Sequence, residues 1–226
     1  TSTEAYAGSA KETGRLKIPR QTVLNAAADD DAVCLVDGND IVCLDRRTGA
    51  PRWRTQPESK GAELWVGTLI IKDGVVLYAE QNLLIALSAK TGKQLWMRQA
   101  KQPGGLWFSW KDIYVIDGLV WTWGPNARGA EQEAHGLDIQ TGDVKKRIPL
   151  GHIFKVDHHH RCYRNKATSR FLIASRRGAE FIDLEGGPHS VNHWVRGICH
   201  LGMMPANGML YAPPEPCKCY WYERIS

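Results

Sequence analysis

The residues best suited to chemistry lie in the last third of the chain. Cys217 and Cys219 are one residue apart, so in a β-strand their side chains face the same side. Cys199, His158 and His160 add further thiol and imidazole groups in the same region. Three or four such ligands hold zinc or copper at about 2.0 to 2.3 Å. The sequence therefore offers these five residues as metal ligands, with zinc, copper or calcium as candidate ions and no other cofactor assigned.

The same region permits a second interpretation, disulfide bonding. Cys162, Cys199, Cys217 and Cys219 are available, and cross-links stabilise a terminal element that has little packing area of its own. Cys217 and Cys219 are a poor pair within one strand, so each would pair with Cys162 or Cys199. Disulfides form in oxidising compartments such as the periplasm. A metal site, disulfides and free thiols all remain open.

Arginines in this region are candidates for binding an anion. The stretch from Arg161 to Arg177 is densely basic, and Arg161, Arg164 and Arg196 are the candidate ligands. A solvated strand-and-turn surface is the alternative. The three consecutive histidines at 158 to 160 alternate faces in a strand, so at most two enter one site. They are compatible with acid–base chemistry, but catalytic residues are left unassigned.

The composition is that of an ordinary globular protein. The chain has 226 residues, of which 43% are hydrophobic and 23% charged. No apolar run approaches the roughly 18 residues that cross a bilayer, so no membrane-spanning segment is expected. The net charge of +5 is too small to indicate nucleic-acid binding.

The beginning of the chain bears on its compartment. Residues Thr1 to Lys17 are polar and lack the apolar core of a secretory signal peptide. The chain is expected to begin partway round a larger architecture, however, so a leader is expected to lie ahead of it. We expect a periplasmic or extracellular location, with the cytoplasm as the alternative.

A repeated phrase predicts the elements that position these side chains. Thr-Gly follows an apolar strand three times, and the three copies are 43 and 50 residues apart: Thr48-Gly49, Thr91-Gly92 and Thr141-Gly142. A period of about 40 to 50 residues with short strands is typical of propeller blades. At the same offset after Gly, the first two copies carry Trp53 and Trp96, and the third carries Lys146.

The strand and turn patterns predict an all-β fold, a β-propeller of about five blades with four antiparallel strands each. Residues 30–149 are expected to form three blades. Residues 1–29 are a leading segment, expected to include a strand of a preceding blade, and residues 150–226 are degenerate blades with the Cys/His-rich tail. These blades are expected to belong to a larger ring.

The phrase has a physical role in joining blades. Glycine adopts a positive φ in a tight hairpin, and the threonine hydroxyl bonds to nearby backbone. The tryptophan has an apolar body to lay on the adjacent blade and an N–H to donate. We therefore expect the three Thr-Gly pairs, Trp53 and Trp96 to serve docking. The loss of tryptophan at Lys146 predicts a different neighbour contact or an end that faces a loop.

The stretches Cys43 to Trp53 and Ala86 to Trp96 resemble the pyrroloquinoline-quinone-like repeat family, whose blades carry the phrase Ala-Leu-Asp-x-x-Thr-Gly-x-x-x-Trp. The resemblance covers roughly Asp30 to Pro149. It implies a quinoprotein-like propeller and is shared by quinoprotein alcohol dehydrogenases and an outer-membrane assembly scaffold. The dehydrogenases would bring an adjacent-cysteine disulfide and a calcium site. This chain has no Cys-Cys pair, so the quinone is not expected as its cofactor.

The tail looks like the C-terminal blades of large bacterial multidomain proteins of unassigned reaction. The resulting hypothesis is a binding or scaffolding module with protein or polysaccharide partners, packed against the remaining blades of the same propeller. The alternative is a catalytic propeller, metal-assisted, polysaccharide-active or quinone-dependent, with its site in the Cys/His/Arg-rich tail. The enzyme question is left open, with the binding module favoured.

Overall fold

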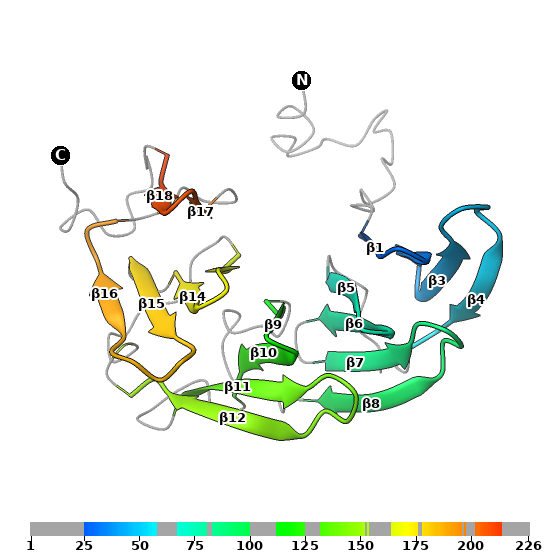
Figure 1. The fold of residues 1–226 in the computed structure, drawn as a ribbon, viewed down its shortest axis with the longest axis horizontal. Helices are drawn as coiled ribbons and strands as arrows, with labels where there is room; N and C mark the ends of the chain where they lie inside the picture. The colour runs from blue at the N-terminus through cyan, green and yellow to red at the C-terminus, as the bar shows by residue number, and fades with distance from the viewer. Residues whose placement is uncertain are drawn as a thin grey trace, which may run out of the picture.

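A computed structural model describes residues 25–57, 67–80, 83–99, 112–124, 132–151, 153, 164–175, 178–195, 197 and 202–213. This part of the chain contains eighteen strands and no helix. The strands form four four-stranded sheets and one two-stranded sheet, with every pairing antiparallel. The sheets follow one another along an arc in chain order (Figure 1). The fold is an all-β propeller, and this prediction is confirmed.

Each four-stranded sheet is one blade, in which consecutive strands pair as a meander. The first two blades consist of β1 (Ala26–Ala28), β2 (Ala32–Asp37), β3 (Asp40–Asp45) and β4 (Pro51–Thr55), then β5 (Thr68–Lys72), β6 (Val75–Glu80), β7 (Leu83–Ser88) and β8 (Gln94–Gln99). The next two consist of β9 (Tyr114–Ile116), β10 (Leu119–Trp123), β11 (Glu133–Asp138) and β12 (Val144–Pro149), then β13 (Lys166–Ala167), β14 (Phe171–Ala174), β15 (Ala179–Asp183) and β16 (Ser190–Asn192). The two-stranded sheet pairs β17 (Met204–Ala206) with β18 (Met209–Tyr211).

Two-residue turns connect the first and second strands of the second and third blades. The φ value is 50° at Asp73 and 75° at Gly74. It is 50° at Asp117 and 72° at Gly118. Positive φ at both central residues suits the twist of a tight hairpin, and Asp or Asn followed by Gly tolerates it best. The same chemistry at Asn207-Gly208 joins β17 to β18. These dipeptides therefore set the register of their hairpins.

The core lies between successive blades, and the second blade shows why. Every residue of β6 is buried. Val76 and Tyr78 pack with the first blade, while Val75 and Leu77 pack with the third. Alternate side chains of a strand point to opposite faces, so a sheet covered on both sides carries an unbroken apolar run.

The first blade also buries two cysteines. Cys34 and Cys43 lie directly opposite each other in the β2–β3 register. Both are free thiols with no exposed surface. Burial is the main cause that raises the pKa of Cys34 far above its ordinary value, so this thiol stays protonated at neutral pH.

Two details differ from the sequence-based expectation. Ala26–Ala28 pairs with β2, so the first blade begins within the leading segment, and this strand does not belong to a preceding blade. Beyond Gly151, β13 and β16 complete a full blade around the expected hairpin of β14 and β15. Residues 214–226, which belong to the predicted Cys/His-rich tail, lie outside the described residues. Among the described residues there is also no helix long and apolar enough to span a bilayer.

Candidate binding sites on the outer rim

The Thr-Gly turn joins the third strand of a blade to its outermost strand. In the first blade the Asp45 carboxylate accepts hydrogen bonds from the backbone N–H of Arg47 and Thr48, at 3.1 and 2.9 Å. The N–H of Gly49, whose φ is 72°, donates to the Asp45 carbonyl at 2.8 Å. Asp138 binds the backbone of Gln140 and Thr141 in the same way in the third blade. The side chain that opens the turn thus holds it closed.

Each docking tryptophan contacts the turn of the next blade. The indole N–H of Trp53 donates to the Ala89 carbonyl at 2.8 Å, and that of Trp96 donates to the Ile139 carbonyl at 2.9 Å. The rings lie against glycine: a Cβ added to Gly92 or Gly142 would be 2.7 Å from Trp53 or Trp96. The tryptophan therefore requires a glycine in the neighbouring turn.

Lys146 occupies the corresponding place in the third blade. It pairs with Gly136 just before a register shift, as Trp53 pairs with Cys43 and Trp96 with Ala86. Its ammonium donates to the carbonyl of Leu184 in the fourth blade. Leu184 follows Asp183 as Ile139 follows Asp138, so the lysine reaches the equivalent carbonyl. The contact between the third and fourth blades therefore differs from the two earlier ones. It keeps the hydrogen bond to the carbonyl but has no indole ring.

The turn of the fourth blade is rebuilt around His189. In the first three blades, the N–H of the residue that opens the turn donates to a backbone carbonyl five residues later. In the fourth blade, the Asp183 N–H donates instead to His189 Nδ1 at 3.1 Å. His189 Nε2 lies 3.0 Å from the Pro149 carbonyl in the third blade. Because Nδ1 accepts and a carbonyl cannot donate, the proton resides on Nε2, and the neutral ring links two blades.

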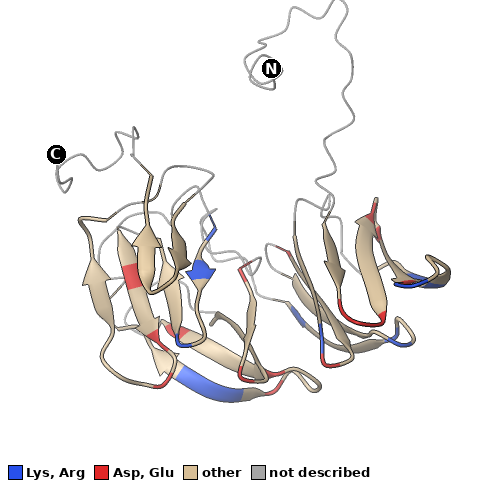
Figure 2. Ribbon diagram, turned by 45° about the horizontal axis from the view of Figure 1, so that its top comes forward, with Lys and Arg blue, Asp and Glu red and all other residues tan. Residues whose placement is uncertain are grey.

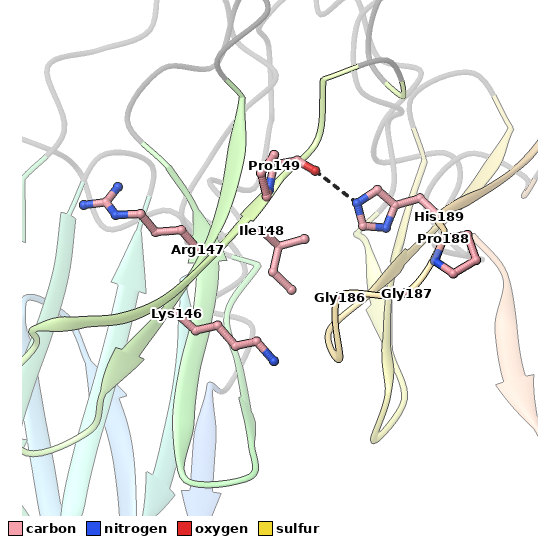
Figure 3. Close-up of a pocket in the computed structure, with 8 residues that line it drawn as sticks. All are labelled: Lys146, Arg147, Ile148, Pro149, Gly186, Gly187, Pro188 and His189. Atoms are coloured by element: carbon pink, nitrogen blue, oxygen red, sulfur yellow. Dashed lines mark hydrogen bonds between the residues drawn. The ribbon is translucent and has the colours of Figure 1, made fainter.

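Lys146 and His189 border a cavity of about 370 Å³, which we call the rim cavity. It is lined by Lys146, Arg147, Ile148, Pro149, Gly186, Gly187, Pro188 and His189. Figure 3 shows Lys146 and Ile148 extending from β12 towards the gap, opposite the Gly186-Gly187 turn, while Arg147 points away. The cavity therefore lies at the interface where the docking tryptophan is absent.

Strand β12 carries the run Lys145-Lys146-Arg147 and forms a basic band on the edge of the third blade (Figure 2). Lys145 and Arg147 are exposed. Arg147 donates to the Glu133 carboxylate at 3.0 Å, and that carboxylate is also 2.8 Å from His135 Nε2. The hydrogen bond from His135 is the first cause that lowers the pKa of Glu133. Lys146 thus adds positive charge to the wall of the rim cavity, and Lys145 adds more on the same outer strand.

The Asp183 carboxylate predicts how this region responds to acid. Hydrogen bonds from Arg170, and then from the Glu185 N–H, hold its pKa below the ordinary value. A lowered pKa in the folded state stabilises the fold above the unfolded pKa of about 3.9 and is lost as pH falls through the folded value. Asp183→Asn is therefore expected to lower stability at pH 7 and to flatten its decline between pH 5 and pH 2, measured by urea unfolding. Asp30→Asn, at an exposed carboxylate, is the control. Parallel declines in Asp183→Asn and the unaltered protein would contradict the assignment.

A second candidate site involves β16, the turn after it and the β17–β18 hairpin, and we call it the apolar surface. It consists of large, exposed hydrophobic side chains: Val191, Trp194, Met204, Met209 and Tyr211. Trp194, Met204 and Met209 are 57%, 58% and 57% exposed. A cavity of about 430 Å³ adjoins it, lined by Phe181, Ser190, Asn192, Trp194, Val195 and Leu210. The surface therefore runs from β16 to the β17–β18 hairpin.

Among the residues proposed as anion or metal ligands, the structure describes only Arg164. Its Nε donates to Asp112 at 3.1 Å and its Nη2 contacts the hydroxyl of Thr68, so it ties together segments that lead into β5, β9 and β13. The others lie outside the described residues: His158, His160, Arg161, Arg196, Cys199, Cys217 and Cys219. Cys162, a candidate for disulfide bonding, lies outside them as well. Within the described ranges, no group of three or more His, Cys, Asp or Glu residues is arranged to hold a metal ion.

Of the residues that shape the two cavities, sequence reasoning singled out only Lys146. The exchange of tryptophan for Lys146 is visible in the repeat and marks the rim cavity. No pattern identifies His189, because it acts as a substitute for a backbone carbonyl in a turn that lacks the Thr-Gly phrase. The apolar surface has no periodic signal either, since its residues come from short, separate segments between positions 191 and 211.

Known proteins support the fold. The serine/threonine-protein kinase AfsK from Streptomyces coelicolor is 28% identical over 143 residues, which are 62% of this chain and 16% of the kinase. BamB from Moraxella catarrhalis has a similar structure, with a TM-score of 0.54 and 16% identity over 74% of this chain and 52% of BamB. The dihydro-heme d1 dehydrogenase NirN has a similar structure, with a TM-score of 0.54 and 16% identity over 83% of this chain and 40% of NirN. A quinohemoprotein alcohol dehydrogenase from Pseudomonas putida has a TM-score of 0.51 and 15% identity over 81% of this chain and 37% of the dehydrogenase.

These matches differ in reach and in what they establish. The chain spans about half of BamB and a small part of the kinase. At these identities the similar structures establish the architecture. A family profile described as "Outer membrane protein assembly factor BamB" matches residues 9–175, and these residues include the docking tryptophans, Lys146 and the inner strands of the fourth blade. The chain therefore belongs to this BamB family of pyrroloquinoline-quinone-like propeller repeats.

Proposed function

We propose that the chain is a binding module that holds a protein partner on the apolar surface. The observation that carries the proposal is a concentration of exposed hydrophobic side chains. Seven large hydrophobic residues are exposed among the described residues, and five of them lie between Val191 and Tyr211. Apolar patches that gather in one place mark interaction sites more often than the same residues scattered singly.

The chemistry of the surface suits a protein segment. Trp194 presents a large, flat ring beside a cavity with both apolar and amide groups in its wall, Val195 and Asn192 among them. Tryptophan and methionine are enriched where proteins bind one another, because they provide large contact areas and adaptable packing. A partner with an aliphatic or aromatic anchor would bury this surface.

The compartment follows from the same proposal. The family description names an outer-membrane assembly factor, which supports a periplasmic or other extracytoplasmic location for this chain. The match to a small part of a kinase is compatible with a module that serves larger proteins by binding. We therefore place the role of these blades in partner recognition, with any reaction supplied elsewhere.

Selection of displayed random peptides on the purified chain tests the proposal. Selected peptides are expected to lose about tenfold or more in affinity on the double variant Trp194→Ser, Met209→Ser, because aromatic and apolar anchors dominate interface energies. Leu95→Ser is the matched control, since Leu95 is 43% exposed on the outer strand of the second blade. Fluorescence anisotropy of labelled peptides measures both affinities. Failure to enrich any peptide, or equal affinity for the double variant and the control, would refute the proposal.

A further inference from the structure

The interface between the third and fourth blades keeps one half of the docking contact and lacks the other. Lys146 supplies the hydrogen bond that Trp53 and Trp96 supply elsewhere. It supplies no ring. In the first two interfaces, a Cβ added to Gly92 or Gly142 would lie 2.7 Å from an indole atom. In the fourth-blade turn, one added to Gly186 meets no atom within 4 Å, and one added to Gly187 meets the Asp183 carboxylate at 2.5 Å but no ring. Gly186 has the positive φ of its turn, 88°. The rim cavity thus lies where the other interfaces hold a ring.

We propose that the rim cavity binds an aromatic side chain of a partner protein, presented on an acidic segment. The chain itself supplies the template, because it seats an indole twice on the same arrangement of outer strand, carbonyl and glycine. The walls suit a flat apolar group, with Ile148, Pro149 and Pro188 on the sides and Gly186 opposite. A ring approaches a glycine closely because no Cβ intervenes.

The charges beside the cavity select the rest of the ligand. The ammonium of Lys146 lines the cavity, where a cation attracts the face of an aromatic ring. Lys145 is exposed on the same edge strand, so carboxylates that flank the ring meet positive charge there. His189 keeps the turn in place through neutral hydrogen bonds and adds no charge of its own. An acidic peptide with one aromatic residue matches the apolar walls of the cavity, the cation of Lys146 and the positive charge of Lys145.

This inference rests on the proposed function in treating the partner as a protein, but it concerns a separate site. Residues of the fourth blade that face the third include Leu172 and Ile182, while Ile173 and Phe181 face the β17–β18 hairpin. The rim cavity and the cavity beside Trp194, which Phe181 lines, therefore lie on opposite faces of one blade. Variants at one site leave the residues of the other unchanged, so the two proposals fail independently.

The test uses a labelled peptide, Asp-Glu-Trp-Glu-Asp, and two control peptides with Ala for the Trp or Lys for the acidic residues. Anisotropy is expected to show at least about tenfold tighter binding of the first peptide than of either control, since ring burial and charge both contribute. Lys146→Trp places the chain's own indole in the cavity and is expected to weaken binding by at least about tenfold. Lys145→Trp makes the same exchange one residue away and is expected to weaken binding only about two- to threefold.

Circular dichroism and thermal melting verify that the variants are folded, and Lys146→Phe replaces Lys146→Trp if the larger ring prevents folding. Equal binding of the Trp and Ala peptides, no binding to the unaltered chain, or full binding to the cavity-filling variant would overturn the proposal. Sedimentation adds a further outcome. Self-association that Lys146→Trp abolishes would assign the cavity to a second copy of the chain and would equally overturn it.

Discussion

Replacing Trp96 with alanine is expected to lower the free energy of unfolding by about 3–5 kcal/mol, the usual loss for a large buried aromatic residue. Trp96 is only 8% exposed and packs in the core between the second and third blades. The substitution removes the ring from Gly142 and the hydrogen bond to Ile139, and a buried carbonyl then lacks its donor. Chemical denaturation with two probes, fluorescence and circular dichroism, measures the change.

Two further variants separate the parts of this contact. Trp96→Phe keeps an aromatic ring but not the N–H, and is expected to cost less than Trp96→Ala. Leu95→Ala, at the neighbouring exposed position, is expected to change stability by no more than about 0.5 kcal/mol. A loss below about 1 kcal/mol for Trp96→Ala would mean that the blades hold together without the tryptophan.

Gly142→Ala is expected to be the second strongly destabilising change, and Gly49→Ala provides a closely matched control. Both glycines end the same kind of turn, with φ values of 74° and 72°, so alanine pays the same backbone penalty of about 1–2 kcal/mol at each. The added methyl group meets Trp96 at 2.7 Å in one case and nothing within 4 Å in the other. Gly142→Ala is therefore expected to cost a further 1–3 kcal/mol or so, the typical cost of overpacking.

The difference between these two variants isolates the docking contact from the turn itself. The double variant Gly142→Ala, Trp96→Ala completes the comparison, because alanine at 142 has no ring to meet once the indole is removed. The costs of the two substitutions should then add to less than their separate values, as expected for residues in contact. Equal destabilisation by Gly142→Ala and Gly49→Ala would show that the indole moves aside freely.

The blades and their turns were predictable because local chemistry determines them. Asp73-Gly74 and Asn207-Gly208 tolerate positive φ, which two-residue hairpins require. The alternation of Val75 and Val76 between two neighbouring blades appears in the sequence as a continuous apolar strand. The docking geometry follows from the spacing of Trp53 and Trp96 after their glycines, because that spacing places each ring beside the next turn.

The candidate binding sites were much less predictable, because they depend on contacts between distant residues. The replacement of tryptophan by Lys146 indicates a changed contact, but not that the lysine reaches the Leu184 carbonyl. His189 performs a backbone role with its side chain, which no propensity describes. Arg164 has the charge of an anion ligand, and its pairing with Asp112, 52 residues earlier, is a property of the folded chain alone.

The docking contact also gives the array of blades a direction. Each tryptophan lies on the outer strand of one blade and meets the turn of the following blade, so the two sides of an interface are unlike each other, as in a head-to-tail assembly. A duplicated second blade would carry both Trp96 and the Gly92 turn, and could enter between the first and third blades without an unmatched face. An extra blade inserted between the third and fourth blades would not match in this way. Either an indole would meet the His189 turn, or Lys146 would meet a Thr-Gly turn. Whole-blade growth is thus compatible with one part of this chain and restricted at a single joint.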